Sequence, residues 1–280
     1  FVKYYVSASK VLTKVFDLRR FGGAVRDNMK KSIVSLAFVV MGCSASVPPK
    51  VSIYHKPDLL REMEATRVEQ RSFVAEARIT YFKKGKRLKG TATIVARKPG
   101  SLRYEIIGPH GGVIEAFATN GKEFQIAKLA ESRFLYGPAT PELLDRLLPF
   151  APLHMTSAGW VELLFGQVYI PKDAVLTYSE ESAQYRFEFE RSETEVVVLV
   201  DPKTTKIQEI RGALAGATQY KVRIVQWAAE GIPGKLHIVV PSQELEVRMH
   251  IREIAMGQLL EDGLFVLDPI AGVASEYLGY

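Results

Sequence analysis

Short runs of strand-forming residues follow one another along most of this chain, with only turns between them. Five runs lie between residues 72 and 129, and eight more lie between residues 174 and 267. The dipeptide Asn120-Gly121 separates two of the first five, and Asn-Gly between strand-like runs is a strong hairpin signal. Because strands joined by tight turns pair antiparallel, the runs predict an antiparallel meander.

The last long run indicates how such a sheet is buried. In ELEVRMHIRE (residues 244–253) apolar residues alternate with polar ones, the apolar set being Leu245, Val247, Met249 and Ile251. Alternation with a period of two predicts a strand with one buried face and one face in water. The runs amount to roughly eleven to thirteen strands, and an open sheet of this size curls instead of staying flat.

A pair of helices interrupts the strands near the middle of the chain. Thr140 is placed to cap the first helix and Pro141 to open it, and leucines recur at helical spacing from Leu143 to Leu148. A second short helix around Trp160 stops at Gly166. Helices this apolar must pack against another apolar surface. We therefore predict a mainly β (α+β) fold, in which a single curved antiparallel sheet forms a half-open β-barrel of about eleven strands with the inserted helices as its lid.

Residues 58–280 are expected to form this one domain. A first helix is predicted from Asp58 to Gln70, with Asp58 as its cap. Residues 43–57 contain three prolines and few large apolar side chains, so they are predicted to be a flexible tether.

The segment before the tether has the pattern of a secretion signal. Lys30 and Lys31 supply positive charge, and the apolar run from Ile33 to Gly42 has ten residues, about half of the roughly 20 that a membrane-spanning helix needs. We expect residues 29–42 to be a signal peptide. Since a secretion signal normally opens a chain, residues 1–28 are interpreted as a mis-assigned upstream extension, with a genuine cytoplasmic segment as the alternative.

The four residues Val40 to Cys43 resemble the lipobox of bacterial lipoprotein precursors. The resemblance implies cleavage before Cys43 and a diacylglycerol thioether on its sulfur, so that several acyl chains hold the mature protein on a membrane. The alternative is a buried N-terminal helix with an inert cysteine. Cys43 is the only cysteine, so the chain cannot form an internal disulfide.

Charge argues against a nucleic-acid-binding protein. The chain carries 37 basic and 31 acidic side chains, but eight of the basic and two of the acidic ones lie in the first 42 residues, which leaves 29 of each in the expected mature part. One local excess remains in KKGKRLKG (residues 83–90). Its basic residues are interpreted either as a solvated hairpin tip or as a patch that touches anionic headgroups; they are Lys83, Lys84, Lys86, Arg87 and Lys89.

The motifs of the common enzyme classes are missing from the sequence. It contains no G-x-S-x-G elbow, H-E-x-x-H pair, phosphate-binding P-loop or dinucleotide fingerprint, and its five histidines are dispersed without the spacing of metal ligands. We therefore expect no enzyme activity, no metal and no cofactor.

Taken together, the lipobox, the loop Gly108-Pro109-x-Gly111 and the helix pair resemble the LolA/LolB-type fold and, within it, the LolB-like outer-membrane lipoproteins. Trp160, Leu164 and Gly166 match the end of that family's second helix. The resemblance covers about Leu59 to Gly166 and reaches the later strands only by their number and pattern.

The resemblance implies a periplasm-facing receptor that shelters acyl chains or acylated lipoprotein clients, with a periplasmic carrier protein as a possible partner. Ser44 stands where the family's sorting rule places an aspartate for inner-membrane retention, so the outer membrane is favoured. Apolar residues of the helix pair are candidates for a lid over the cavity, although ordinary core is the equal alternative because both are lined alike; they are Leu143, Leu147, Phe150, Trp160, Leu164 and Phe165.

The loop of Pro109, His110 and Gly111 corresponds to the family's membrane-delivery loop. In LolB-like receptors an exposed leucine occupies the position of His110. Since histidine partitions poorly into hydrocarbon, we expect this loop to touch headgroups at most. A second function remains open, in which the same fold is a structural or interaction scaffold of the cell envelope, and a hydrolase is a less favoured third.

Overall fold

The computed structural model describes residues 54–67, 69–108, 110–148 and 154–279. Fourteen strands in these ranges form one curved sheet that does not close, so the mainly β class is confirmed while the strand number exceeds the expected eleven. The strands of the first half are β1 (Ser72–Lys83), β2 (Lys86–Arg97), β3 (Ser101–Ile107), β4 (Val113–Thr119), β5 (Glu123–Lys128) and β6 (Arg133–Pro138). Those of the second half are β7 (Val175–Ser179), β8 (Gln184–Arg191), β9 (Thr194–Val200), β10 (Ile207–Leu214), β11 (Ala217–Trp227), β12 (Pro233–Val240), β13 (Leu245–Met256) and β14 (Ser275–Tyr277).

Two meanders meet in the middle of the sheet. The strand order is β14-β6-β5-β4-β3-β2-β1-β13-β12-β11-β10-β9-β8-β7, so the first long strand pairs with the last long one. The β1–β13 pair is antiparallel and sets Ile79 opposite Met249 and Tyr81 opposite Val247. These side chains belong to the face that packs against the helices. We call it the inner face, and the opposite one the outer face.

The structure corrects the predicted strands at three places. β6 and β14 were not expected, and the two run parallel, whereas every other neighbouring pair is antiparallel. Residues 263–267, expected to be a strand, include instead a 3₁₀ turn from Asp262 to Phe265.

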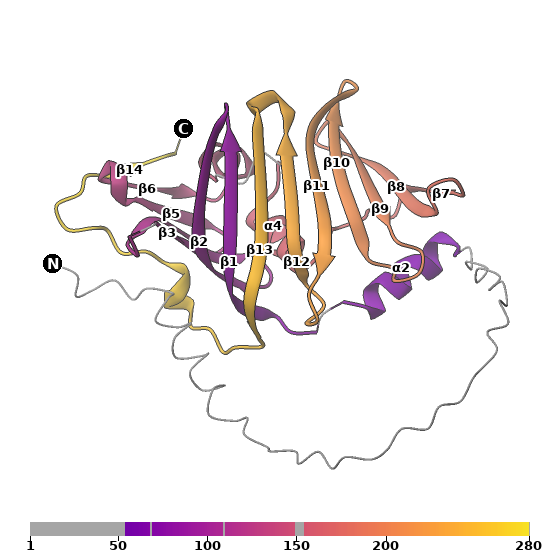
Figure 1. Ribbon diagram of the computed structural model, residues 1–280, viewed down its shortest axis with the longest axis horizontal. Coiled ribbons are helices and arrows are strands. Elements are labelled where there is room, and N and C mark those ends of the chain that lie inside the picture. Colours follow the sequence, from indigo (N-terminus) through magenta and orange to yellow (C-terminus); the bar gives the residue numbers. More distant parts are fainter. Residues whose placement is uncertain (1–53, 68, 109, 149–153, 280) are drawn as a thin grey trace, which may run out of the picture.

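The helices α3 (Pro141–Leu147) and α4 (Ser157–Leu164) connect β6 to β7, which lie near opposite edges of the sheet. The chain therefore crosses the inner face, and Figure 1 shows the sheet curling around α4. The predicted cap of α3 is confirmed, because the Thr140 hydroxyl accepts a hydrogen bond from the amide of Leu143. Thr156 caps α4 in the same way. None of the helices in the described ranges is long and apolar enough to cross a bilayer.

A third helix, α2 (Lys56–Ala65), covers the lower end of the second half in Figure 1. It begins earlier than predicted, with His55 at its N-cap, so Asp58 lies in the first turn and pairs with Arg61 instead of capping the helix. Leu59 is fully buried, and the amide of Tyr54 donates a hydrogen bond of 2.6 Å to the Tyr185 hydroxyl.

The segment after β13, residues 257–278, forms a strap across the outer face of the first half. Leu260 and Phe265 pack against Val74 and Val95, and a second set of apolar residues around Leu267 packs over β4 to β6. The Arg97 guanidinium lies 4.7 Å from the centre of the Phe265 ring. The strap therefore buries part of the outer face of the first half.

Candidate ligand-binding cleft

The inner face divides into a closed part and an open part. The closed part, which we call the seam, lies between α4 and the middle strands and has a free volume of only about 30 Å³. Its lining is apolar and includes Trp160, Leu164, Leu148 and Met249. Since one water needs about 10–15 Å³ of such volume, the seam between these residues is filled core without room for an acyl chain.

The open part is a cleft of about 1130 Å³ at the end of the sheet where the β1–β2 hairpin turns. The hairpin forms one wall, β3, β4 and the end of β5 form the floor and second wall, and α3 lies across from them. Leu148 lines both the cleft and the seam, so the two spaces adjoin. The cleft is large enough for a small-molecule ligand, for which pockets of about 300–1000 Å³ are typical.

Apolar side chains form much of the cleft surface. They come from six elements and are Ile79, Tyr81, Leu88, Ile106, Ile114, Leu147 and Leu245. Leu88 and Ile114 are 65% and 44% exposed. An acyl chain on these side chains would bury apolar surface that now faces water, which is favourable by about 0.8 kcal/mol per CH₂ group.

A carboxyl group lies at the bottom of the cleft. The Tyr104 hydroxyl, itself fully buried, donates a hydrogen bond of 2.8 Å to Oε1 of Glu115. Burial raises the pKa of Glu115, although the bond from Tyr104 and the positive charge of Lys128 act in the opposite direction. Burial and the charge of Glu115 hold the pKa of Tyr104 far above its ordinary value.

On the wall formed by α3, Asp145 is paired with His154. The backbone amide of His154 donates to both carboxylate oxygens of Asp145 at 3.1 Å, and its ring Nδ1 lies 3.0 Å from Oδ2. This contact ties the segment that leads into α4 to α3. Hydrogen bonds from its own backbone and from Thr140 lower the pKa of Glu142 at the start of the helix.

The structure brings several of the candidate site residues to this one cleft. Leu147 and three of the five basic residues of the hairpin, Lys83, Lys84 and Lys89, line it. Lys86 does not, and neither does Arg87, whose guanidinium lies 5.3 Å from the centre of the Phe82 ring.

The candidate delivery loop lies at the same end of the sheet. Register pairs Thr91 of β2 with Ile107 of β3, so the β3–β4 loop stands beside the β1–β2 hairpin. His110 and Gly111 are exposed, and a hydrogen bond of 2.9 Å from the amide of Gly108 to the carbonyl of Gly112 closes the turn.

The remaining lid candidates lie elsewhere. Leu143 is half-buried and packs against the main core without reaching the cleft. Phe165 is buried against Phe73, with ring centres 5.1 Å apart. The candidates Cys43, Pro109 and Phe150 lie outside the described residues.

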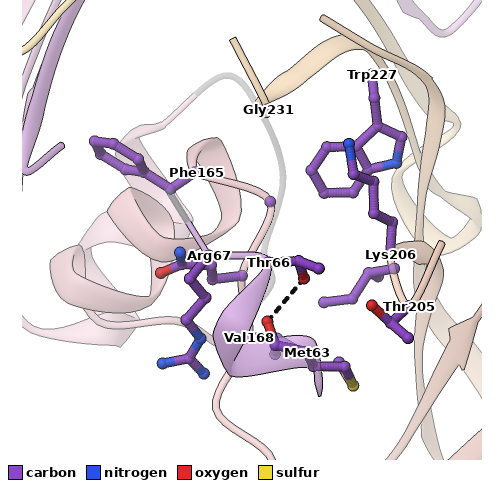
Figure 2. A pocket seen from close by; sticks show the side chains of 12 residues that line it. Met63, Thr66, Arg67, Phe165, Val168, Thr205, Lys206, Trp227 and Gly231 are labelled. Atoms are coloured by element: carbon purple, nitrogen blue, oxygen red, sulfur yellow. Dashed lines mark hydrogen bonds between the residues drawn. The ribbon is translucent and has the colours of Figure 1, made fainter. Parts of the chain in front are cut away.

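Phe165 also lines a small pocket of about 30 Å³ between α2, the end of α4 and β11. Figure 2 shows Lys206 alongside Trp227 on one wall, and the hydrogen bond of 2.9 Å from the Thr66 hydroxyl to the carbonyl of Met63 on another. A Cβ on Gly166 would lie 2.3 Å from the Trp227 ring, and its backbone has φ +71°, so only glycine fits there.

Sequence reasoning missed the floor of the cleft. Glu115 shares the inner face with Phe117 two residues later, and a charged residue in phase with a buried aromatic one is a signal that the run GVIEAFAT does contain. Ile79 and Tyr81 continue the inner-face pattern of β1 and line the cleft. Within the described ranges, no three His, Asp, Glu or Cys side chains are placed to hold a metal ion.

Comparison of the structure with solved structures identifies the fold. A LolA superfamily protein from Nitrosomonas europaea matches 78% of this chain and 100% of its own, with TM-score 0.53 and 11% identity. The chain has the LolA-like fold. A DUF1329 family protein from Desulfovibrio piger shares it (TM-score 0.53, 13% identity, 75% of this chain and 95% of that one). So does a Vibrio parahaemolyticus domain described as an outer-membrane lipoprotein-sorting protein (TM-score 0.52, 10% identity, 74% and 94%).

The solved structures confirm the LolA-like fold that the sequence motifs predicted. No family model matches the sequence, and no curated protein matches it significantly. At 10–13% identity the likeness establishes the arrangement of strands and helices and leaves the ligand to be argued from the cleft.

Proposed function

We propose that this protein is a membrane-anchored carrier or acceptor that binds acyl chains, or the acyl chains of lipoprotein clients, in the open cleft. The observation that carries the proposal is the cleft itself, whose volume is about 1130 Å³ and whose apolar lining comes from the hairpin, β3, β4 and α3. Exposed Leu88 and Ile114 are unfavourable in the empty protein and become buried when an acyl chain occupies the cleft.

The proposed setting is the periplasmic side of the outer membrane. It rests on the lipobox-like residues before Cys43 and on the solved lipoprotein-sorting domain with the same fold. Transfer of a client needs binding and release and no bond-breaking step, so the proposal requires neither a catalytic group nor a cofactor. A periplasmic carrier protein is the proposed source of the client, and the loop around His110 the proposed contact with headgroups.

A second candidate function is an interaction scaffold of the cell envelope that holds no lipid. The filled seam favours it, because the free volume of about 30 Å³ at Trp160 and Leu164 is that of ordinary core. The two functions differ in what they predict for the open cleft, which a scaffold does not need.

Two substitutions on the helix pair test the proposal. Leu147→Trp places a bulky ring in the open cleft, so we expect weaker binding of a fluorescent fatty acid with little change in melting temperature. Leu164→Trp overpacks the closed seam, so we expect a loss of about 1–3 kcal/mol in stability. Its binding affinity should match that of the wild type, measured at a temperature where the variant is folded.

Two results would reject the carrier function. One is a wild-type protein that binds no fatty acid. The other is equal loss of affinity in both variants, which would show that the probe does not occupy the open cleft.

A further inference from the structure

Four basic side chains gather at one place on the outer face. Register sets Arg78 of β1 and Lys235 of β12 on either side of His250 of β13, and Arg252 follows on the same face of β13. Adjacent strands lie about 4.8 Å apart, so the first three form a short row across three strands. Arg78, His250 and Arg252 are exposed, and Lys235 is half-buried. We call these four residues the basic cluster.

Several other cations of the outer face lie in ion pairs, while within the described ranges those of the basic cluster do not. Glu209 accepts from Arg211 and Arg223 and pairs with Lys221, and Glu246 pairs with His237 and Arg248. No such ion pair involves a member of the basic cluster within the described ranges. The nearest acids on these strands, Glu76 and Glu253, face each other across the β1–β13 pair, next to the bulge.

The charged side chains that shift the pKa of His250 are all basic. Burial lowers the pKa of His250, and the charges of Lys235, Arg252 and Arg78 lower it further, with no carboxylate acting in the opposite direction. The chain after residue 42 has equal numbers of basic and acidic side chains. The cluster is therefore a local arrangement of charge and not a consequence of an overall basic composition.

The position of the basic cluster favours a flat partner. β1 and β13 are the two middle strands of the 14-stranded sheet, and the sheet curls away from them toward the helices (Figure 1). A plane that approaches a convex surface touches its middle first. We propose that the basic cluster docks this protein onto an anionic membrane surface through the phosphates of lipid headgroups. This surface is separate from the acyl-chain cleft and does not depend on the function proposed for it.

The proposal predicts salt-sensitive binding to anionic vesicles. Each basic residue near an anionic surface strengthens binding about fivefold, so Arg78→Gln together with Lys235→Gln should weaken binding about 25-fold. The measurement is co-sedimentation of the full chain carrying Cys43→Ser, without its lipid, with phosphatidylglycerol-containing vesicles. Vesicles of pure phosphatidylcholine, which carry no net charge, are the reference for binding. The charge-preserving pair Arg78→Lys and Lys235→Arg should bind as the wild type does.

The matched control removes two cations that already have partners on the same face, by Arg211→Gln together with Arg248→Gln. It loses the same net charge, and we expect a much smaller effect. Equal losses in the two double variants would overturn the proposal, because net charge alone would then explain binding. All variants should melt within a few degrees of the wild type.

Three further results would also overturn it. Equal binding to neutral vesicles would remove the electrostatic origin. If inorganic phosphate, at a concentration equal to that of the lipid phosphates, releases the protein from the vesicles, the cluster would be assigned to a free phosphate ligand. Binding to polyglutamate without binding to vesicles would assign it to an acidic protein.

Discussion

Glu115 and Glu209 are carboxylates of one sheet with opposite electrostatic surroundings. Glu115 lies at the bottom of the cleft, where burial raises its pKa and its hydrogen-bond donor is the neutral Tyr104. For Glu209, burial also acts to raise the pKa, but hydrogen bonds from three basic side chains outweigh it and lower the pKa below the usual value. The two should therefore affect stability in opposite directions as pH changes.

Glu115→Gln should make the protein more stable at neutral pH. Between the unfolded-state pKa near 4.5 and the raised folded-state pKa, the native protein binds more protons at Glu115 than the unfolded chain does. Stability is therefore lost as pH rises through that window, and glutamine removes the loss. Urea unfolding of both proteins across acid and neutral pH checks the difference, which should vanish at low pH.

Glu209→Gln should have the reverse effect. Its contribution is present above the unfolded-state pKa and is lost as pH falls through the lowered folded-state pKa. The variant should thus be less stable than the wild type at neutral pH and approach it in acid. If Glu115→Gln instead destabilised the protein at neutral pH, the carboxylate would be favoured in the cleft, and the stated environment of Glu115 would be wrong.

At the scale of elements, the local sequence pattern predicted a strand or a helix correctly where the residues of that element themselves carry the signal. Strand-forming runs between turn signals located β1–β5 and β7–β13, and the predicted Thr140 cap belongs to a helix that the structure confirms. β6 was not predicted, and it ends in Gly137 and Pro138, residue types that are common in turns. The structure gives a different reason for the glycine, since a Cβ on Gly137 would lie 2.3 Å from the Leu278 carbonyl oxygen beside β14.

The strap illustrates what local pattern cannot supply. β14 has three exposed residues and no alternation, so only its pairing with β6 makes it a strand. The run at residues 263–267 is apolar because it covers the outer face, and short apolar runs do not distinguish a strand from a covering turn. Both features depend on contacts with residues more than a hundred positions away in sequence.

Phe265→Ala tests whether the strap stabilises the sheet. The ring is fully buried against Val74 and Val95, so its loss should cost about 3–5 kcal/mol in the free energy of unfolding. The neighbouring Val266 is 43% exposed, and Val266→Ala should change stability by less than about 0.5 kcal/mol. Similar values for the two, measured by urea unfolding, would show that the strap contributes little.

At the scale of the whole molecule, the inner face combines a filled seam with an open cleft. Sequence placed apolar residues on the helix pair but could not separate these two parts, because cavities and cores have similar linings. The structure separates them by volume, about 30 Å³ at Trp160 and about 1130 Å³ at Leu147. Lys83 and Lys89 also line the cleft. Their place there depends on where the β1–β2 hairpin ends relative to α3, and no local sequence pattern gives that relation.

Cys43→Ser tests the proposed anchor separately from the cleft. The proposed anchor at Cys43 precedes the expected domain of residues 58–280, so the substitution should leave the melting temperature unchanged and release the protein from washed membranes into the soluble fraction. A variant that stays in washed membranes as the wild type does would contradict the lipobox interpretation and leave the cleft unaffected.

The location of a bound acyl chain tests the central claim most directly. The full chain is incubated with a fatty acid that carries a photoactivatable diazirine on its chain, irradiated, digested and mapped by mass spectrometry. We predict adducts on peptides that contain Tyr81, Leu88 or Leu147, and their loss when unlabelled fatty acid is in excess. Adducts spread over the outer face, or none that unlabelled fatty acid displaces, would contradict an acyl-chain site in the open cleft.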